Sequence, residues 1–518
     1  MTATDETTSP DMVGSRVLVT NMLFSAFVRL WRAGLQLIFT PIFIHLLGPE
    51  AYGLVAFNAT VLMALLFIEQ ATSPVILREF GRWGGATSGI ASIRDLLRSL
   101  EVVSCATALT IGGSVLILAP WIADKVLSTQ VLDKGMLTDA LRLIGLNIAL
   151  QWPSFLYSSC FVALQKQNIL ARLTAVLTTV QVVGAALLLW LMDADILSFL
   201  AWQVFGAAVN SLVLGMTAWK LIPLATVRPR VRMAVLRRVF RFAMGTMAIG
   251  GTGAALTQAD KLIVSGVVTL DQFSVYAVAF FVANQVAALA IAPISTPLQP
   301  YLAHLVAMER EDLLAREYHR WTQILWLACL VVLGPLIAFP GILLGAWLGT
   351  ASPMVGSVAT LLPVVLIGTM LNSVMGMPFI LQMASGWVRL SLFKNIVAMA
   401  VFLPALVLLL PHYGMVVGAW LWVALNLYYF LIEVPLMHRR LLRAELWRWW
   451  GYDILLPGGI TAGLMVVSAR LAPVGVSPVW GVAYVTLTAV VIGCALLLVL
   501  PMARHDVVLF LRFVRYKV

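Results

Sequence analysis

The chain alternates from end to end between long apolar runs and short polar or basic segments. Fourteen of the runs are apolar enough, over about 20 residues, to cross a bilayer as helices. The pattern therefore predicts an all-α polytopic membrane protein with about 14 transmembrane helices. The predicted spans are 17–40, 51–76, 99–119, 138–161, 170–192, 196–220, 242–268, 273–299, 321–347, 356–384, 392–411, 415–437, 453–470 and 479–501.

The charges between the spans predict how the chain is oriented. With a cytoplasmic N-terminus, 27 of the 34 Lys and Arg residues fall in inside segments and only four in outside segments. Cytoplasmic loops of membrane proteins carry such an excess of positive charge. The distribution predicts that both termini are cytoplasmic, and it explains the net charge of +11 without a nucleic-acid partner.

Short matches at a constant offset indicate an internal repeat. Leu-Asn at 146–147 precedes Pro153 as Leu-Asn at 371–372 precedes Pro378, and Tyr52 matches Tyr276. The offsets of about 225 residues predict two parallel six-helix lobes, which move by rocking about a shared substrate site. We expect five parts: a disordered cytoplasmic tail 1–16, lobes 17–226 and 242–440, a cytoplasmic amphipathic linker helix 227–241, and an additional two-helix unit with a cytoplasmic tail 441–518.

The first span carries a polar stripe that includes two arginines. On a helix, Asn21, Ser25, Arg29, Arg32 and Gln36 fall within about 80° of one another. A charge in the membrane faces a wet cavity or a partner rather than lipid. The stripe is therefore predicted to line a cavity for an anion. The alternative is that an arginine reaches the interface or pairs with a buried carboxylate such as Glu69.

The seventh span is the counterpart of the first, and its polar residues share one face that ends in Asp260 and Lys261. These two could form a local pair, or Asp260 could bind a proton or neutralise an arginine across the cavity. Asp260, Glu69 and Glu433 are the candidate ion-coupling residues, and Lys261 joins the candidate substrate-binding residues. The charged segment 307–321 is predicted to be a solvated cytoplasmic helix.

Enzymatic chemistry is not indicated. The chain has no Gly-rich phosphate-binding loop, the six histidines lack ligand spacing, and no soluble segment is large enough for a catalytic domain. We expect no enzyme activity, no catalytic residue, no metal and no cofactor.

Five segments resemble the polysaccharide transporter family of lipid-linked oligosaccharide flippases, within the multidrug/oligosaccharidyl-lipid/polysaccharide exporter superfamily. The first, TPIFIHLLGPEAYGLVAF, resembles the family's segment after the first span, with His45 as a departure. The others are FLYSSCFVALQKQNILAR, QADKLIVSGVVTLDQFSVYAVA, ILLGAWLG and MLNSVMGMPFILQMASGWVRLSLFKN. Together they follow the family's order over most of residues 17–440.

The resemblance implies a V-shaped two-lobed bundle that works by alternating access. It implies transport of a polyprenyl-diphosphate-linked oligosaccharide, a polysaccharide repeat unit for lipopolysaccharide or exopolysaccharide, across a bacterial inner membrane to the outer leaflet. Arg29, Arg32, Gln36 and Lys261 are then the candidate contacts to the anionic substrate, since arginine suits bidentate phosphate binding. Expected partners are the lipid-linked glycan and the bilayer, with membrane-bound glycan polymerases and co-polymerases as further candidates.

Two other functions remain open. One is a drug or small-molecule cation antiporter of the same superfamily, although the arginines and the lack of a carboxylate in the first span argue against it. The other is a non-transporting membrane scaffold of glycan assembly. The energy source is also open between protons, another ion and the membrane potential.

Overall fold

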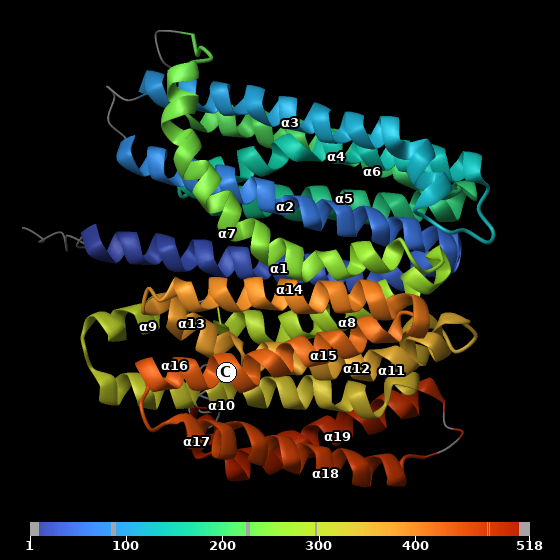
Figure 1. Cartoon of the computed structure of the whole chain (residues 1–518), viewed down its shortest axis with the longest axis vertical. Coiled ribbons are helices and arrows are strands. Elements are labelled where there is room, and N and C mark those ends of the chain that lie inside the picture. Colours follow the sequence, from blue (N-terminus) through green and yellow to red (C-terminus); the bar gives the residue numbers. More distant parts are fainter. Residues whose placement is uncertain are drawn as a thin grey trace, which may run out of the picture. The chain divides into compact units, whose positions relative to one another are not determined.

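The computed structural model describes residues 10–83, 90–223, 228–295, 298–473, 475 and 477–506. Nearly all of these residues are helical, and no β-strand occurs among them. The chain divides into two compact units, Met1–Leu262 and Ile263–Val518. They are described separately below, and the helices of both are labelled in Figure 1.

The N-terminal unit is organised around α4. This helix packs along α3 and α6 and also contacts α2, whereas α1 lies chiefly against α5. The helices of this unit are α1 (Pro10–Leu47), α2 (Pro49–Trp83), α3 (Ile90–Lys125), α4 (Lys134–Ala163), α5 (Gln167–Met192), α6 (Ile196–Leu221) and most of α7 (Met233–Ser265).

The C-terminal unit is organised in the same way around α12. This helix packs on α10, α15 and α8, as α4 packs on α3, α6 and α2. The pattern is what a duplication would produce, and the repeat itself stays a prediction. The helices are α8 (Leu270–Ser295), α9 (Leu298–Ala307), α10 (Glu311–Ala338), α11 (Pro340–Leu348), α12 (Met354–Val374), α13 (Gly376–Ala384), α14 (Val388–Tyr413), α15 (Val416–Tyr428), η2 (Tyr429–Glu433), α16 (Val434–Leu441), α17 (Leu446–Arg448), η3 (Trp449–Leu455), α18 (Leu456–Leu471) and α19 (Pro478–Val499).

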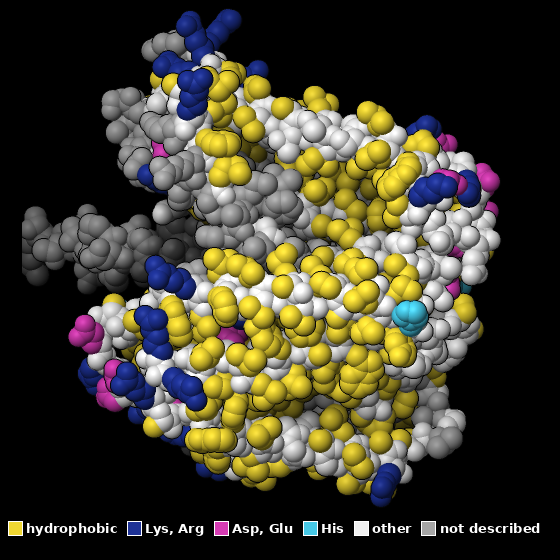
Figure 2. All heavy atoms as spheres, in the orientation of Figure 1, with side chains coloured by type: hydrophobic (Ala, Val, Ile, Leu, Met, Phe, Trp, Pro, Cys, Tyr) yellow, Lys and Arg dark blue, Asp and Glu magenta, His cyan; other side chains and the backbone are white. Residues whose placement is uncertain are grey.

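The prediction of an all-α polytopic membrane protein is confirmed. Eleven helical stretches of the described residues are long and apolar enough to cross a membrane, and the long helices α2, α4 and α7 coincide with the other three predicted spans. Figure 2 shows apolar side chains over the middle of the C-terminal unit, whereas its Lys and Arg side chains gather at its ends, mostly near α9 and α16. The protein is therefore a multi-pass membrane protein.

Close packing and local caps fix the N-terminal unit. A side chain on Gly112 of α3 would meet the Ala149 Cβ of α4 at 2.6 Å, so glycine allows these two helices to approach. Glu50 accepts hydrogen bonds from the backbone N–H groups of residues 130–132 and so ties the loop before α4 to the start of α2. Asp195 caps α6 by accepting the Ser198 N–H, which holds the pKa of Asp195 below its ordinary value.

Three boundaries differ from the sequence prediction. Helix α1 begins at Pro10, so part of the predicted disordered tail is helical, while residues 1–9 lie outside the described part. The predicted linker helix is not a separate element, because residues 228–232 have no regular secondary structure and α7 then runs without a break from Met233 into the predicted seventh span. The predicted span 321–347 is interrupted between α10 and α11, where Pro340 begins a new helix.

The segment 307–321 is helical from Glu311, but the expectation that it is simply solvated is wrong. Tyr318 and His319 are fully buried within the C-terminal unit. The sequence does not indicate this buried face, because Tyr318 and His319 lie among charged residues and a buried histidine does not contribute to an apolar pattern.

Candidate functional site

The polar stripe of α1 is exposed where its arginines lie. Arg29, Arg32 and Gln36 are all exposed, and on a helix Thr40 and Phe43 continue the same stripe. At these last two positions the stripe is buried, and the Phe43 ring lies edge-on to Phe199 of α6, with 5.2 Å between centroids. Among the described side chains, the stripe is therefore exposed from Arg29 to Gln36 and covered at Thr40 and Phe43.

The arginine side of α1 is held in place by neighbouring contacts. The Trp31 indole N–H donates to the Thr179 hydroxyl of α5 at 2.9 Å, which fixes the rotation of α1. Arg32 finds no ion-pair partner among the described residues. The side chains of Asn21, Ser25 and Glu69 lie outside the described residues, so the predicted alternative of an Arg–Glu69 pair stays untested. An exposed, unpaired guanidinium can bind a phosphate through two parallel N–H bonds.

Asp260 and Lys261 form the local pair that was one of the two predicted alternatives. The Lys261 ammonium donates to Asp260 Oδ1 at 3.2 Å and to the Thr257 carbonyl at 2.9 Å. Both side chains are mostly buried. The geometry leaves their roles in substrate binding and ion coupling as predictions.

Glu433, one of the candidate ion-coupling residues, lies in a buried ion pair. Its carboxylate contacts the Lys394 ammonium of α14 and accepts a hydrogen bond from Gln382 of α13 at 2.7 Å. The Lys394 ammonium also lies 4.3 Å from the centre of the Tyr429 ring. Lys394 is one of the 27 charges predicted to lie inside, and the structure adds that its side chain is only 12% exposed.

A second ionisable cluster was missed altogether. His319 of α10 contacts Asp453 of η3 through Nδ1 and Glu445 through Nε2, the latter at 2.9 Å. These partners are more than 120 residues from His319 in the chain. The only sequence signal was an aspartate, Asp453, at the start of a predicted span.

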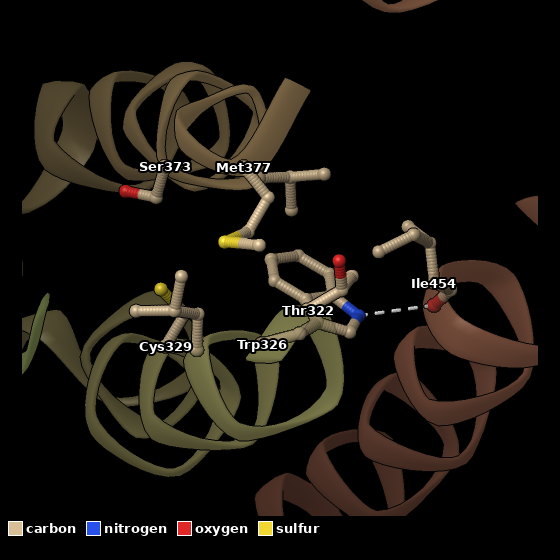
Figure 3. A pocket seen from close by; sticks show the side chains of 8 residues that line it. Thr322, Trp326, Cys329, Ser373, Met377 and Ile454 are labelled. Atoms are coloured by element: carbon tan, nitrogen blue, oxygen red, sulfur yellow. Dashed lines mark hydrogen bonds between the residues drawn. The ribbon is translucent and has the colours of Figure 1, made fainter. Parts of the chain in front are cut away.

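A small cavity lies beside this cluster. It is lined by Thr322, Trp326 and Cys329 of α10, Ile454 of η3 and Ser373 of α12, and Met377 of α13 points toward Trp326 (Figure 3). The Trp326 indole N–H donates to the Ile454 carbonyl at 3.0 Å. The cavity of about 10 Å³ has room for at most one water molecule. It is therefore too small for a glycan or a drug.

The described residues hold no group of three or more His, Cys, Asp or Glu side chains arranged to bind a metal ion. The Glu433–Lys394 pair and the His319 contacts belong to the C-terminal unit, whereas the candidate site on α1, in the N-terminal unit, offers positive charge and hydrogen-bond donors. Such an arrangement can recognise an anion.

Solved structures with the same fold are transporters of the MOP superfamily. The lipid II flippase MurJ in an inward closed conformation matches with a TM-score of 0.68 and 10% identity, covering 92% of this chain and 97% of that chain. An inward-facing multidrug resistance MATE family transporter matches with a TM-score of 0.62 and 13% identity, covering 81% and 96%. A MOP superfamily transporter from Pyrococcus furiosus matches with a TM-score of 0.52 and 14% identity, covering 82% and 96%. At these identities the likeness shows the fold alone.

A search of curated proteins found no significant match. A family model does match, over residues 42–350, which is more than half of the chain. This range includes α2 to α11, and it begins at the end of the arginine-bearing helix. The chain therefore belongs to the polysaccharide biosynthesis protein family.

Proposed function

We propose that this protein is a flippase that moves a polyprenyl-diphosphate-linked oligosaccharide from the cytoplasmic to the outer leaflet of a bacterial inner membrane by alternating access. The observation that carries the proposal is the exposed arginine stripe of α1 in a chain of the polysaccharide biosynthesis family. The substrate's diphosphate is anionic, so it complements a cationic surface. A structural neighbour is itself named as a lipid II flippase.

Arg29 and Arg32 are proposed to bind the diphosphate, with Gln36 adding a neutral donor one turn further along the same face. Arg32 supports this role best, because among the described residues it has no carboxylate to neutralise it. Lys261 is a weaker candidate, since its ammonium already donates to Asp260 and Thr257. The direction of transport is the one that the resemblance to lipid-linked oligosaccharide flippases implies, and the positive-inside rule separately predicts that both termini are cytoplasmic.

The test is flipping of a fluorescent polyprenyl-diphosphate oligosaccharide in proteoliposomes. Charge-assisted hydrogen bonds contribute roughly 1.5–3 kcal/mol each. The double variant Arg29→Ala/Arg32→Ala is therefore expected to lower the initial rate by at least about tenfold. Replacing both arginines by lysine should restore part of the rate, because the charge returns without the bidentate geometry.

The matched control is Arg142→Ala/Arg470→Ala, which removes the same charge from two segments predicted to face the outside. It should flip at the wild-type rate. All variants are compared at equal thermal stability. An unchanged rate in Arg29→Ala/Arg32→Ala would remove the arginines from substrate binding. A wild-type protein that flips no such lipid but moves an organic cation would establish the antiporter instead.

A further inference from the structure

Three ionisable side chains meet in the interior of the C-terminal unit, and we call them the His319 cluster: His319, Asp453 and Glu445. The side chains of His319 and Asp453 are 0% exposed, and that of Glu445 is 28% exposed. Both nitrogens of the imidazole face a carboxylate oxygen. Glu445 is therefore the only member of the cluster through which solvent reaches it.

The geometry requires one proton more than three separate groups would carry at neutral pH. An ionised carboxylate only accepts hydrogen bonds, whereas a neutral imidazole has a single N–H. Two imidazole–carboxylate contacts therefore need either a doubly protonated ring or a protonated carboxyl group. With this proton, and with Arg448 lying 3.7 Å from Glu445, the charges sum to zero. Without it, a net negative charge is buried, which is costly.

Among the described residues nearest the cluster, the other charges are already paired or lie on elements that do not reach it. Arg320 and Glu317, on the same end of α10, pair with each other, and Arg320 also pairs with Asp506. Neither α12 nor α13, which pack on α10, contains a charged residue. The ionisable and charged groups nearest the cluster among the described residues are Tyr318 of α10, His438 of α16, Arg448 of α17 and Glu433 of η2, and Glu433 is itself paired with Lys394.

Unpartnered polar atoms surround the cluster as well. The Tyr318 hydroxyl, His438 Nε2 and Gln323 Oε1 are buried and find no hydrogen-bond partner among the described residues. Gln323 donates through its amide nitrogen to Asp453 at 2.8 Å. Buried polar groups of this kind are normally satisfied by ordered water. The interior around His319 is therefore polar.

The cluster also joins distant parts of the chain. It links α10 to η3 and to the segment before α17, which lead into the last two long helices, α18 and α19. Two indole N–H bonds accompany it, from Trp449 to Thr322 at 3.2 Å and from Trp326 to the Ile454 carbonyl at 3.0 Å. Loss of the proton would leave these bonds to hold the junction against a buried negative charge.

The N-terminal unit contains a corresponding contact with different chemistry. Asp95 of α3 lies 224 residues before His319, close to the repeat offset. It pairs with Arg232 at 2.5 Å and accepts the Arg230 N–H, so it binds the segment that follows α6. Arg232 keeps its charge at any pH that proteins tolerate. Each unit therefore holds such a segment in place: Asp95 binds residues 230–232 through the permanent cation Arg232, and the titratable ring of His319 binds Glu445 and Asp453.

We propose that the His319 cluster is a binding site for one exchangeable proton, which holds η3 and the segment before it against α10. When the proton leaves, the buried negative charge loosens this junction. The site is separate from the α1 stripe and does not depend on which substrate the protein carries. The stabilisation is present while the cluster is protonated and is lost as the pH rises through the midpoint of the transition.

The test is hydrogen–deuterium exchange of the full-length protein in nanodiscs from pH 5.5 to 9, corrected for the intrinsic exchange rate. Residues 445–455 are expected to exchange at least about tenfold faster at the alkaline end. Residues 228–236, which carry the Arg232 contact, serve as the internal control and should show no such change. Exchange of 445–455 that is independent of pH would overturn the proposal.

Three variants make the test specific to this cluster. His319→Gln keeps an N–H donor but cannot titrate, so the pH dependence should disappear. Glu445→Gln removes one anion that attracts the proton, so the midpoint should fall. His438→Gln, which removes a buried histidine bonded only to the Val434 carbonyl, should retain the pH dependence.

If His319→Gln does not fold, Glu445→Gln still decides, because Glu445 is partly exposed and its replacement is nearly isosteric. An unchanged midpoint in Glu445→Gln, or a wild-type profile in His319→Gln, would rule out the proton site.

Discussion

At the scale of single residues, the buried charges Glu433 and Lys394 of the C-terminal unit form an ion pair, and each charge is stabilised by the other. Glu433 and Lys394 are 1% and 12% exposed, so neither charge is well solvated if its partner is lost. We expect Glu433→Gln alone to destabilise the protein by about 3–5 kcal/mol, because it strands a buried ammonium. The double variant Glu433→Gln/Lys394→Met should recover most of this loss, since neither charge then remains.

Thermal unfolding of the purified protein measures these differences. Arg142→Ala is the control, because it breaks the Arg142–Asp139 pair, in which both side chains are more than half exposed, and it should have little effect. A double variant no more stable than Glu433→Gln would contradict the pairing argument. If the double variant is stable yet transports without ion coupling, the predicted coupling role of Glu433 is supported.

The same scale shows what the sequence could and could not reveal. The face shared by Arg29, Arg32 and Gln36 follows from helical periodicity alone, and all three are exposed as an anion site requires. The His319 cluster combines residues 126 and 134 positions apart, so no local spacing discloses it. The Lys394–Glu433 pair is hidden for a related reason, because the count of Lys and Arg residues says nothing about what a side chain packs against.

At the scale of helices, glycine sets the distance between α3 and α4. We expect Gly112→Ala to destabilise the protein, because the new methyl group would lie 2.6 Å from the Ala149 Cβ and 2.8 Å from the Gly145 carbonyl. The neighbouring residue is the matched control. Gly113 has nothing within 4 Å of an added Cβ, so Gly113→Ala should stabilise the helix by up to about 1 kcal/mol.

The opposite signs of these two substitutions are the readout, and melting temperatures in one detergent are sufficient to compare them. Equal effects at positions 112 and 113 would mean that helix propensity, not packing, controls this interface.

Boundaries of helices were less predictable than their existence. Apolar runs locate the spans, whereas the break before Pro340 and the wide turns of η2 and η3 depend on packing that hydropathy does not record.

At the scale of the whole molecule, the direction of transport depends on the orientation in the membrane. The Lys and Arg count predicts that the loop before α4 lies outside and that the turn between α9 and α10 lies inside. Val131 and Met308 report on these two positions, and their side chains are 85% and 50% exposed. In a background with all four cysteines replaced, Val131→Cys should react with an impermeant maleimide in intact cells, whereas Met308→Cys should react only after permeabilisation.

These two labels test the number of spans as well as the orientation of the chain. Inside and outside segments alternate along the chain. One miscounted span would therefore exchange the predicted side of every later segment. Val131 precedes the fourth predicted span and Met308 follows the eighth, so opposite labelling of the pair tests the spans between them as a set. If both cysteines label from the same side, one span in this region has been miscounted. If both are reversed, the predicted orientation is inverted, both termini lie outside, and the proposed flipping direction loses its support.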